Sequence, residues 1–277
     1  MLYKDLYKWG SLELEQVHIP EAMLDARLLL EYVCHTTLSD LHVQGDMVVG
    51  EADEATYRKM IEKRKSRIPV QHITGEQEFM GLNFKVNDQV LVPRQDTEIL
   101  VEEVMKNLHD GMHILDMCTG SGCILLSLLH YSNDCQGTGT DISEAALAVA
   151  KKNAEALSLE ANWIQSDLFE KIDGKYDIIV SNPPYIASAV IPTLEPEVRD
   201  HEPMMALDGK EDGLYFYQRI VKECKKNLYH GGMLFFEIGY DQGNALVTLM
   251  SENGFKEVEV VKDYAGLDRV VFGTLAV

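Results

Sequence analysis

A strand followed by a glycine turn is predicted in residues 113–122, His-Ile-Leu-Asp-Met-Cys-Thr-Gly-Ser-Gly. The apolar run 113–117 indicates a buried strand, and the apolar run 123–130 that comes after the turn indicates a helix. Glycine at such a junction lets the backbone bend sharply and approach a ligand, with the amide groups of the helix facing that ligand. A tight turn with only a structural role, or a dinucleotide-binding loop, would read similarly. The run has G-x-G without a third spaced glycine, which disfavours NAD or FAD.

Strands and helices alternate on the carboxyl side of this turn. The predicted strands are 136–141, 162–165, 176–181 and 233–238, and the predicted helices are 144–157 and 213–228. This alternation is typical of a parallel sheet with helices on both faces. Two more strands, 256–262 and 269–274, are joined by a short loop without a helix, so this final pair must be antiparallel.

The amino-terminal part has a different pattern. Residues 1–70 carry helical apolar spacing, with Pro20 near a helix start and Pro69 ending a helix over 53–66. Residues 71–89 combine glycine, asparagine and short apolar runs, which predicts a hairpin linker. We therefore expect a helical domain over 1–70, a linker over 71–89 and an α/β domain over 90–277.

Composition narrows the functional classes. The 277 residues are 46% hydrophobic and 25% charged, as in an ordinary soluble protein, and no run approaches the roughly 20 apolar residues of a membrane helix. Charges near the amino terminus argue against a signal peptide, so we expect a cytoplasmic protein. Five scattered cysteines predict reduced thiols and no metal site.

The net charge of −20 argues against a nucleic-acid substrate, because phosphate neutralisation requires a basic surface. One basic cluster interrupts the acidic background. Either it is a solvated helix face, or it docks an acidic or RNA-associated partner. The cluster comprises Arg58, Lys59, Lys63, Arg64, Lys65 and Arg67.

Acidic residues recur where predicted strands end. Asp116 precedes the glycine turn, Asp141 ends the next strand, and Asp167 follows the third. A carboxylate at the place of Asp141 can accept hydrogen bonds from both hydroxyls of a ribose, although capping the following helix is an alternative. Asp167 can accept from an adenine amino group while Leu168 covers the ring. A single such Asp is more often a turn residue, but three in succession indicate a site.

The sharpest signal is Asn182-Pro183-Pro184-Tyr185, directly after a predicted buried strand. The prolines fix an extended backbone and remove two N–H donors, so the loop offers acceptors, namely the Asn182 side-chain oxygen and the Pro183 carbonyl. A planar NH2 group has two hydrogens to donate, and Tyr185 can stack on its face. This arrangement suits catalysis on an amide or amino nitrogen.

Together these residues resemble the class I S-adenosylmethionine methyltransferases with an Asn-Pro-Pro-Tyr motif. Within them the chain is similar to the HemK/PrmC family, the glutamine methyltransferases of peptide-chain release factors. Further runs that carry the resemblance are Ile73–Leu82, Val92–Glu98, Pro196–Arg199, Glu202–Gly209 and Glu237–Gly239.

The resemblance implies a Rossmann-like seven-stranded sheet, S-adenosylmethionine as methyl donor and, as target, the glutamine in the Gly-Gly-Gln motif of class 1 release factors. The helical domain would recognise the release factor. The enzyme would act as a monomer and would bind neither a nucleic acid nor a membrane directly. Asn182, Pro183 and Tyr185 would be catalytic, and Asn182 to Tyr185 would contact the substrate. The cofactor would contact Asp116, Cys118, Thr119, Gly120, Ser121, Gly122, Asp141, Asp167, Leu168 and Asn182.

One departure from the family pattern is Cys118, where the family usually has glycine. A cysteine preserves the turn unless this position requires a positive φ. Two other functions remain open. The same loop would suit an enzyme that methylates the amino group of adenine in DNA or RNA, although base flipping requires a basic cleft. A scaffold subunit without activity is the third, and the presence of Asn182 and Asp141 argues against it.

Overall fold

The computed structural model describes residues 1–276. The helical elements are α1 (Tyr3–Gln16), α2 (Ala22–Cys34), α3 (Leu38–Val43), α4 (Glu51–Lys65), α5 (Val70–Thr74), α6 (Gln95–Asn107), α7 (Cys123–Tyr131), α8 (Glu144–Leu157), η1 (Ile191–Thr193), α9 (Pro196–Arg199), α10 (Met204–Leu207), α11 (Tyr215–Glu223), η2 (Cys224–Lys226) and α12 (Gly243–Glu252). The strands are β1 (Glu76–Phe79), β2 (Leu82–Lys85), β3 (His113–Met117), β4 (Gln136–Asp141), β5 (Asn162–Gln165), β6 (Tyr176–Ser181), β7 (Leu228–Glu237), β8 (Phe255–Lys262) and β9 (Asp268–Leu275).

The chain divides into two compact units. The first comprises Met1–Glu76 together with Glu195–His201, and the second comprises Gln77–Leu194 and Glu202–Val277. The segment 195–201 is far in sequence from the rest of the first unit, and the sequence pattern gives no indication of this association. No helix in the part of the chain that the structure describes is long and apolar enough to span a membrane.

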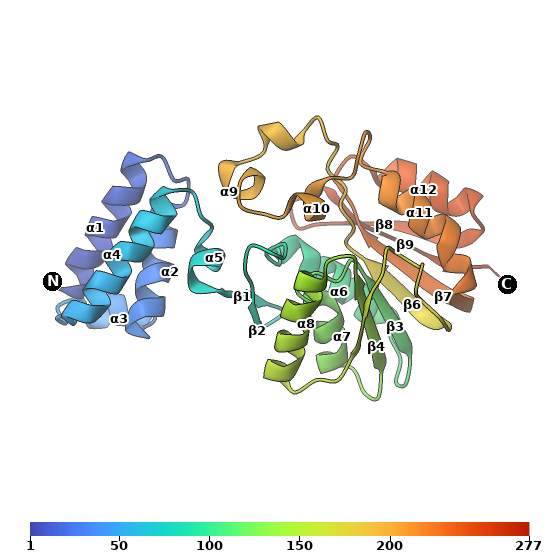
Figure 1. Cartoon of the computed structure of the whole chain (residues 1–277), viewed down its shortest axis with the longest axis horizontal. Helices are drawn as coiled ribbons and strands as arrows, with labels where there is room; N and C mark the ends of the chain where they lie inside the picture. Colours follow the sequence, from blue (N-terminus) through green and yellow to red (C-terminus); the bar gives the residue numbers. More distant parts are fainter. Residues whose placement is uncertain (277) are drawn as a thin grey trace. The chain divides into compact units, whose positions relative to one another are not determined.

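The first unit is built on α1, α2 and α4, which pack on one another (Figure 1). Their apolar residues recur at helical spacing, and Leu6, Leu29 and Ile61 are completely buried between them. Tyr57 is also buried, and its hydroxyl donates to the carbonyl of Ala26 at 3.1 Å. The bond satisfies a polar atom that burial would otherwise leave unpaired.

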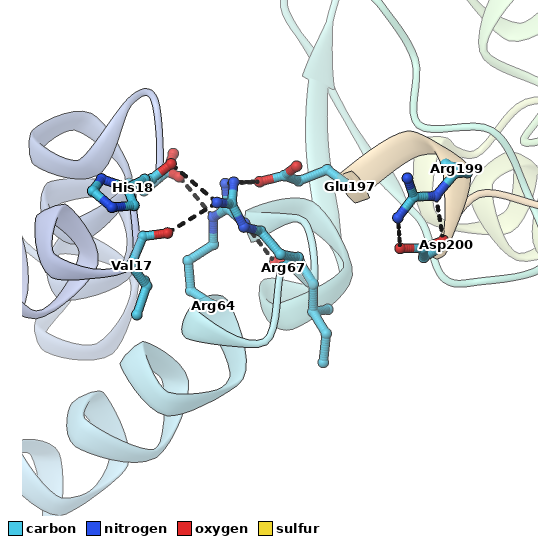
Figure 2. A network of polar contacts seen from close by, with 9 residues as sticks. Val17, His18, Arg64, Arg67, Glu197, Arg199 and Asp200 are labelled. Carbon is cyan, nitrogen blue, oxygen red and sulfur yellow. Dashed lines mark hydrogen bonds and ion pairs between the residues drawn. The ribbon is translucent and has the colours of Figure 1, made fainter. Parts of the chain in front are cut away.

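Glu197 joins the segment 195–201 to this helical unit, as Figure 2 shows. One Glu197 oxygen accepts from Arg64 at 2.8 Å and from Arg67 at 3.3 Å. The Arg64 guanidinium also donates to Asp25 at 2.7 Å, while Arg67 donates to the carbonyl of Val17 at 2.9 Å. These charge-assisted bonds fix a short segment that has little apolar surface of its own.

The same contacts explain much of the basic cluster at 58–67. Besides Arg64 and Arg67, Arg58 pairs with Glu54 and lies over the Trp9 ring, and Lys65 pairs with Glu13. Of the six basic residues, only Lys59 and Lys63 are exposed. Most residues of the cluster therefore form contacts inside the first unit, which favours a structural role over a docking face.

The second unit is centred on a seven-stranded sheet with the order β5-β4-β3-β6-β7-β9-β8. The first five strands of this order run parallel, and β9 is antiparallel to both β7 and β8. The chain moves outward from β3 through β4 to β5 and then returns to the other side of β3 with β6. This reversal places the carboxyl ends of β3 and β6 side by side, where α/β sheets bind their ligands.

The buried strands separate two apolar cores because successive side chains point to opposite faces. Ile114 and Phe235 pack on the face covered by α6, α7 and α8, whereas Leu115 and Phe236 pack on the face covered by α11 and α12 (Figure 1). The expected Rossmann-like seven-stranded α/β fold is confirmed. The predicted strands 113–117, 136–141, 162–165 and 176–181 and the helix 144–157 agree with the structure.

Other boundaries differ from the sequence pattern. The helix predicted over 213–228 covers only Tyr215–Glu223 before a 3-10 turn, and β7 begins at Leu228. Two amphipathic helices, α6 and α12, were not predicted. Each buries one face against the sheet, and its buried residues recur at helical spacing, so the signal for both helices was present in the sequence. The β1–β2 hairpin lies in the expected linker and turns at Met80 and Gly81, both with positive φ.

We expect Arg64→Ala to destabilise the protein strongly, because it would leave the Asp25 carboxylate buried without its guanidinium partner. Breaking a buried pair on one side typically lowers the free energy of unfolding by about 3–5 kcal/mol. Urea unfolding measures this change. Lys63→Ala, on the exposed side of the same helix, is the matched control and should change it by less than about 0.5 kcal/mol. Equal effects of the two substitutions would contradict the assignment.

Candidate functional site

A cavity of about 500 Å³ opens at the carboxyl ends of β3, β4, β5 and β6. Four loops that follow these strands supply one wall. The predicted site residues that line it are Cys118, Thr119, Gly120, Ser121, Asp141, Asp167, Leu168, Asn182 and Pro184. Among the residues described, Asp116, Gly122, Pro183 and Tyr185 are absent from this lining, so the structure brings most but not all of the predicted residues to one surface.

The loop after β3 has an open face toward the cavity. Gly120 has φ of 55°, and a Cβ added to it would meet nothing within 4 Å. Its amide donates to Asp141 Oδ2 at 3.0 Å, which ties the β3 loop to the end of β4. Gly122 has φ of 80°, and its close neighbours Trp163 and Ala150 leave little space for a side chain. Gly120 thus leaves the backbone open to a ligand in the cavity, whereas Gly122 permits close packing inside the protein.

Asp116 lies behind this loop, fully buried. It shares a hydrogen bond with the Thr119 hydroxyl, so it braces the loop instead of facing the cavity. Burial raises the pKa of Asp116 to about 7, although the hydrogen bond from Thr119 acts in the opposite direction. A carboxyl group whose pKa is raised to near 7 is typical of functional sites.

Cys118 has φ of 61°, in the left-handed region that favours glycine. Because this position has a positive φ, a cysteine in place of glycine does not simply preserve the turn. The conformation costs a non-glycine residue about 1 kcal/mol, which contacts with the core beneath the sheet help to offset. The thiol is one of five free cysteines in the chain.

Asp141 ends β4 with both carboxylate oxygens bonded to backbone amides. Oδ2 accepts from Gly120, and Oδ1 accepts from Ser143 at 2.9 Å. Capping of α8 is instead performed by the Ser143 hydroxyl, which accepts from Ala146 at 3.1 Å. Burial raises the pKa of Asp141, and the two amides partly reverse that effect. Each oxygen retains acceptor capacity toward the cavity, because a carboxylate oxygen can take two hydrogen bonds.

Asp167 and Leu168 form the wall after β5. Asp167 Oδ1 is in an ion pair with Arg219 at 2.9 Å, a contact that sequence reasoning did not anticipate. Leu168 is buried with φ of 48°, and the Ser166 hydroxyl donates to its carbonyl at 2.8 Å. The Ser166 side chain therefore holds this loop in a strained conformation, and in that conformation Leu168 lines the cavity.

Asn182 leaves β6 at the cavity wall. Its Nδ2 lies 3.5 Å from the Thr97 hydroxyl, a weak hydrogen bond that orients the side-chain amide. Since the NH2 group faces Thr97, the acceptor oxygen remains for another partner. Thr97, in the first turn of α6, also lines the cavity. The sequence contained a signal for Thr97, because this residue belongs to the run Val92–Glu98 that carried the family resemblance.

Tyr185 is held by a buried acid. Its hydroxyl donates to Glu237 Oε1 at 3.2 Å, and Glu237 is almost completely buried at the end of β7. Burial raises the pKa of Glu237, while Thr97, Arg269 and Tyr185 act to lower it. Burial likewise raises the pKa of Tyr185, and the Glu237 carboxylate adds to the shift. The phenol therefore stays protonated and anchors the end of the Asn-Pro-Pro-Tyr loop.

Another part of the lining comes from two segments that sequence reasoning did not assign to the site. These are residues 89–94 and 203–210, which include Arg94, Met204 and Met205. Buried Glu202 joins them, because it accepts from Arg94 at 2.9 Å and from the Val92 amide at 3.2 Å. Both segments overlap runs that carried the family resemblance, and that overlap was the signal in the sequence that could have identified them.

Comparisons with known proteins agree over nearly the whole chain. Residues 5–75 match the family described as PrmC N-terminal domain, and residues 94–193 match the methyltransferase small domain. A release factor glutamine methyltransferase of Agrobacterium fabrum is 40% identical over 266 residues, covering 93% of this chain and 92% of the relative. A protein of Clostridium acetobutylicum with the same name is 42% identical, covering 90% of each chain. A methyltransferase structure from Pyrococcus furiosus, 17% identical, superposes with a TM-score of 0.57 over 78% of this chain and 100% of that one; this likeness shows the fold.

We expect Asp116→Asn to change how stability depends on pH. In the folded protein the pKa of Asp116 is about 7, above the value of about 3.9 for an unfolded chain. Between these values the folded state binds more protons, so this group makes the wild type less stable as the pH rises. Asparagine does not titrate and can still accept from Thr119.

Urea unfolding at about pH 5 and about pH 7.5 checks this prediction. The stability of Asp116→Asn relative to the wild type should increase between the two pH values. Asp110→Asn, which changes an exposed aspartate, is the matched control. The same relative stability of Asp116→Asn at both pH values would show that the carboxyl group does not titrate in this range.

Proposed function

The chain belongs to the family of release factor glutamine methyltransferases, and on this premise we propose that it methylates the side-chain amide nitrogen of a release-factor glutamine. The target is the glutamine of the Gly-Gly-Gln motif. S-adenosylmethionine is the methyl donor. The observation that supports the proposal most directly is Asn182, whose NH2 group faces Thr97 and whose oxygen is left to accept from a substrate amide.

The cavity suits the methyl donor in three respects. Its volume of about 500 Å³ is within the range of small-molecule sites. Gly120 leaves open space where a side chain would otherwise project. The buried hydroxyls of Ser121 and Thr140, both on the lining, have no hydrogen-bond partner among the described residues and so can bond to a ligand.

We assign the residues of the β3 loop, Asp116 and Cys118 to Gly122, to holding the cofactor, either directly or, for Asp116 and Gly122, by shaping the loop. Asp141 would accept the two ribose hydroxyls, and Asp167 and Leu168 would contact the adenine. Arg219 supports this arrangement, because its ion pair fixes the Asp167 side chain.

For the substrate nitrogen we propose that Asn182 Oδ1 and the Pro183 carbonyl accept the two amide hydrogens. Tyr185, half-buried and anchored through its hydroxyl, has ring surface left to lie against the amide, and Pro184 completes the wall. The bound cofactor supplies an electrophilic methyl group on a positively charged sulfur. As the N–C bond forms and the S–C bond breaks, the nitrogen loses a proton to water. Hydrogen bonds to both amide hydrogens favour the pyramidal nitrogen that this step requires.

The acidic balance of the chain favours a protein substrate over DNA or RNA. With a net charge of −20, the enzyme would repel phosphates over about a Debye length, roughly 8 Å at physiological salt. We assign recognition of the release factor to the helical unit and expect a monomer that acts in the cytoplasm, where release factors work. Methylation of adenine is the alternative that the test must address.

The test is methyl transfer from labelled S-adenosylmethionine to a purified release factor, to its Gln-to-Ala variant in the Gly-Gly-Gln motif, and to DNA and RNA. We expect label only on the unmodified release factor, with mass spectrometry locating one methyl group on the Gly-Gly-Gln peptide. Label on adenine with an unmodified release factor would establish the alternative.

We also expect two variants to separate cofactor binding from turnover. Asp141→Ala should weaken cofactor binding at least tenfold, because charge-assisted bonds contribute about 1.5–3 kcal/mol each. Asn182→Ala should lower kcat about a hundredfold or more and change cofactor affinity less, because its acceptor acts on the substrate nitrogen.

Calorimetry and steady-state kinetics measure the two effects. Glu160→Ala removes an exposed acid that is not part of the lining, so it is the matched control for the charge change at Asp141. Unchanged cofactor affinity in folded Asp141→Ala, or near-normal kcat in Asn182→Ala, would refute the corresponding role.

A further inference from the structure

Gln242 ties the end of the Asn-Pro-Pro-Tyr loop to two other segments. Its Nε2 donates to the Tyr185 carbonyl at 3.1 Å and to the Gly213 carbonyl at 3.3 Å. Its Oε1 accepts from the Gly239 amide at 2.9 Å. One half-buried side chain therefore satisfies three backbone groups from loops that follow β6, α10 and β7.

The backbone of Tyr185 fits closely against two glycines. A Cβ on Gly209 would lie 2.8 Å from Tyr185 backbone atoms, and one on Gly213 would lie 2.3 Å from the Tyr185 carbonyl oxygen. Ile186 adds two hydrogen bonds beside this contact. Its amide donates to the Leu207 carbonyl, and its carbonyl accepts from the Gly209 amide. The peptide after Tyr185 consequently has very little room to shift.

Tyr185 is thus held at both ends. Gln242 binds its carbonyl, and Glu237 binds its hydroxyl. We propose that Gln242 is a positioning residue for methyl transfer, an inference that rests on the function proposed above. By fixing Tyr185, it keeps the extended Asn-Pro-Pro-Tyr backbone in place and with it the acceptor of Asn182 and the carbonyl of Pro183.

Only a side-chain amide meets the requirements of this position. The three backbone partners of Gln242 demand two hydrogens to donate and one oxygen to accept, and the primary amide of glutamine supplies both. An ionised glutamate of the same length would keep the bond from Gly239 but direct a negative oxygen at the carbonyls of Tyr185 and Gly213. A protonated glutamate would regain one donor.

This chemistry gives an experiment with the full-length enzyme, a release factor and S-adenosylmethionine. Gln242→Ala should lower kcat about tenfold to a hundredfold, since small displacements of reacting groups cost this much. The KM for S-adenosylmethionine should change little, because none of the hydrogen-bond partners of Gln242 lies in the loops after β3, β4 and β5 that we assign to the cofactor. In Gln242→Glu, kcat relative to the wild type should be low at about pH 8 and rise toward about pH 6 as the half-buried carboxylate, which faces two carbonyl oxygens, protonates.

A stability control separates positioning from a general weakening of the fold. Leu249→Ala removes a partly buried apolar side chain from α12, the helix that begins directly after Gln242, and it removes no hydrogen bond to Tyr185. It should lower the melting temperature and leave kcat unchanged at an assay temperature below melting. If Gln242→Ala does not fold, the isosteric Gln242→Glu still provides the pH profile.

The outcomes are distinguishable. Lower kcat with unchanged KM for the cofactor, together with recovery of Gln242→Glu in acid, supports the inference. Variants at Gln242 with wild-type kcat, or with a kcat ratio independent of pH, overturn it while leaving the proposed function intact. A wild-type enzyme that does not methylate the release factor overturns the proposed function itself.

Discussion

The parallel pairing of β3 with β6 is the constraint on which the site depends. Their last paired residues are Met117 and Ser181, and the Ser181 hydroxyl donates to the Met117 carbonyl at 2.7 Å. Cys118 and Asn182 follow directly, so the glycine loop and the Asn-Pro-Pro-Tyr loop leave the sheet as neighbours. A shift of one residue in this register would turn every side chain of one strand to the other face and separate the two loops.

Buried acids support the site from behind. Asp116, Glu202 and Glu237 are all buried with raised pKa values, and each bonds to a residue of the site, namely Thr119, Arg94 and Tyr185. A buried acid is costly unless it is hydrogen-bonded. Their placement concentrates this cost at the loops that must hold their shape, together with the left-handed Cys118 and Leu168. Strain of this kind persists only where the surroundings determine the conformation.

The helical unit uses charge in a different way. Its segment 195–201 contributes little apolar surface, and Glu197 holds it to Arg64 and Arg67. A chain with a large acidic excess thus places several of its cations where they neutralise its own carboxylates. The basic cluster, which in sequence suggested a partner, is explained in large part by these internal pairs.

The sequence by itself determined the alternation of most strands and helices along the second unit, the acidic strand end at Asp141 and the acceptor loop at Asn182. These features follow from local patterns, because strand periodicity, proline and glycine act over a few residues. The contact of Glu197 with Arg64, the bond from Tyr185 to Glu237 and the bridge of Gln242 were decided only by the tertiary structure. Each joins residues far apart in the chain, and a side chain's partner over such a separation depends on which surfaces the packed elements bring together, which no local pattern records.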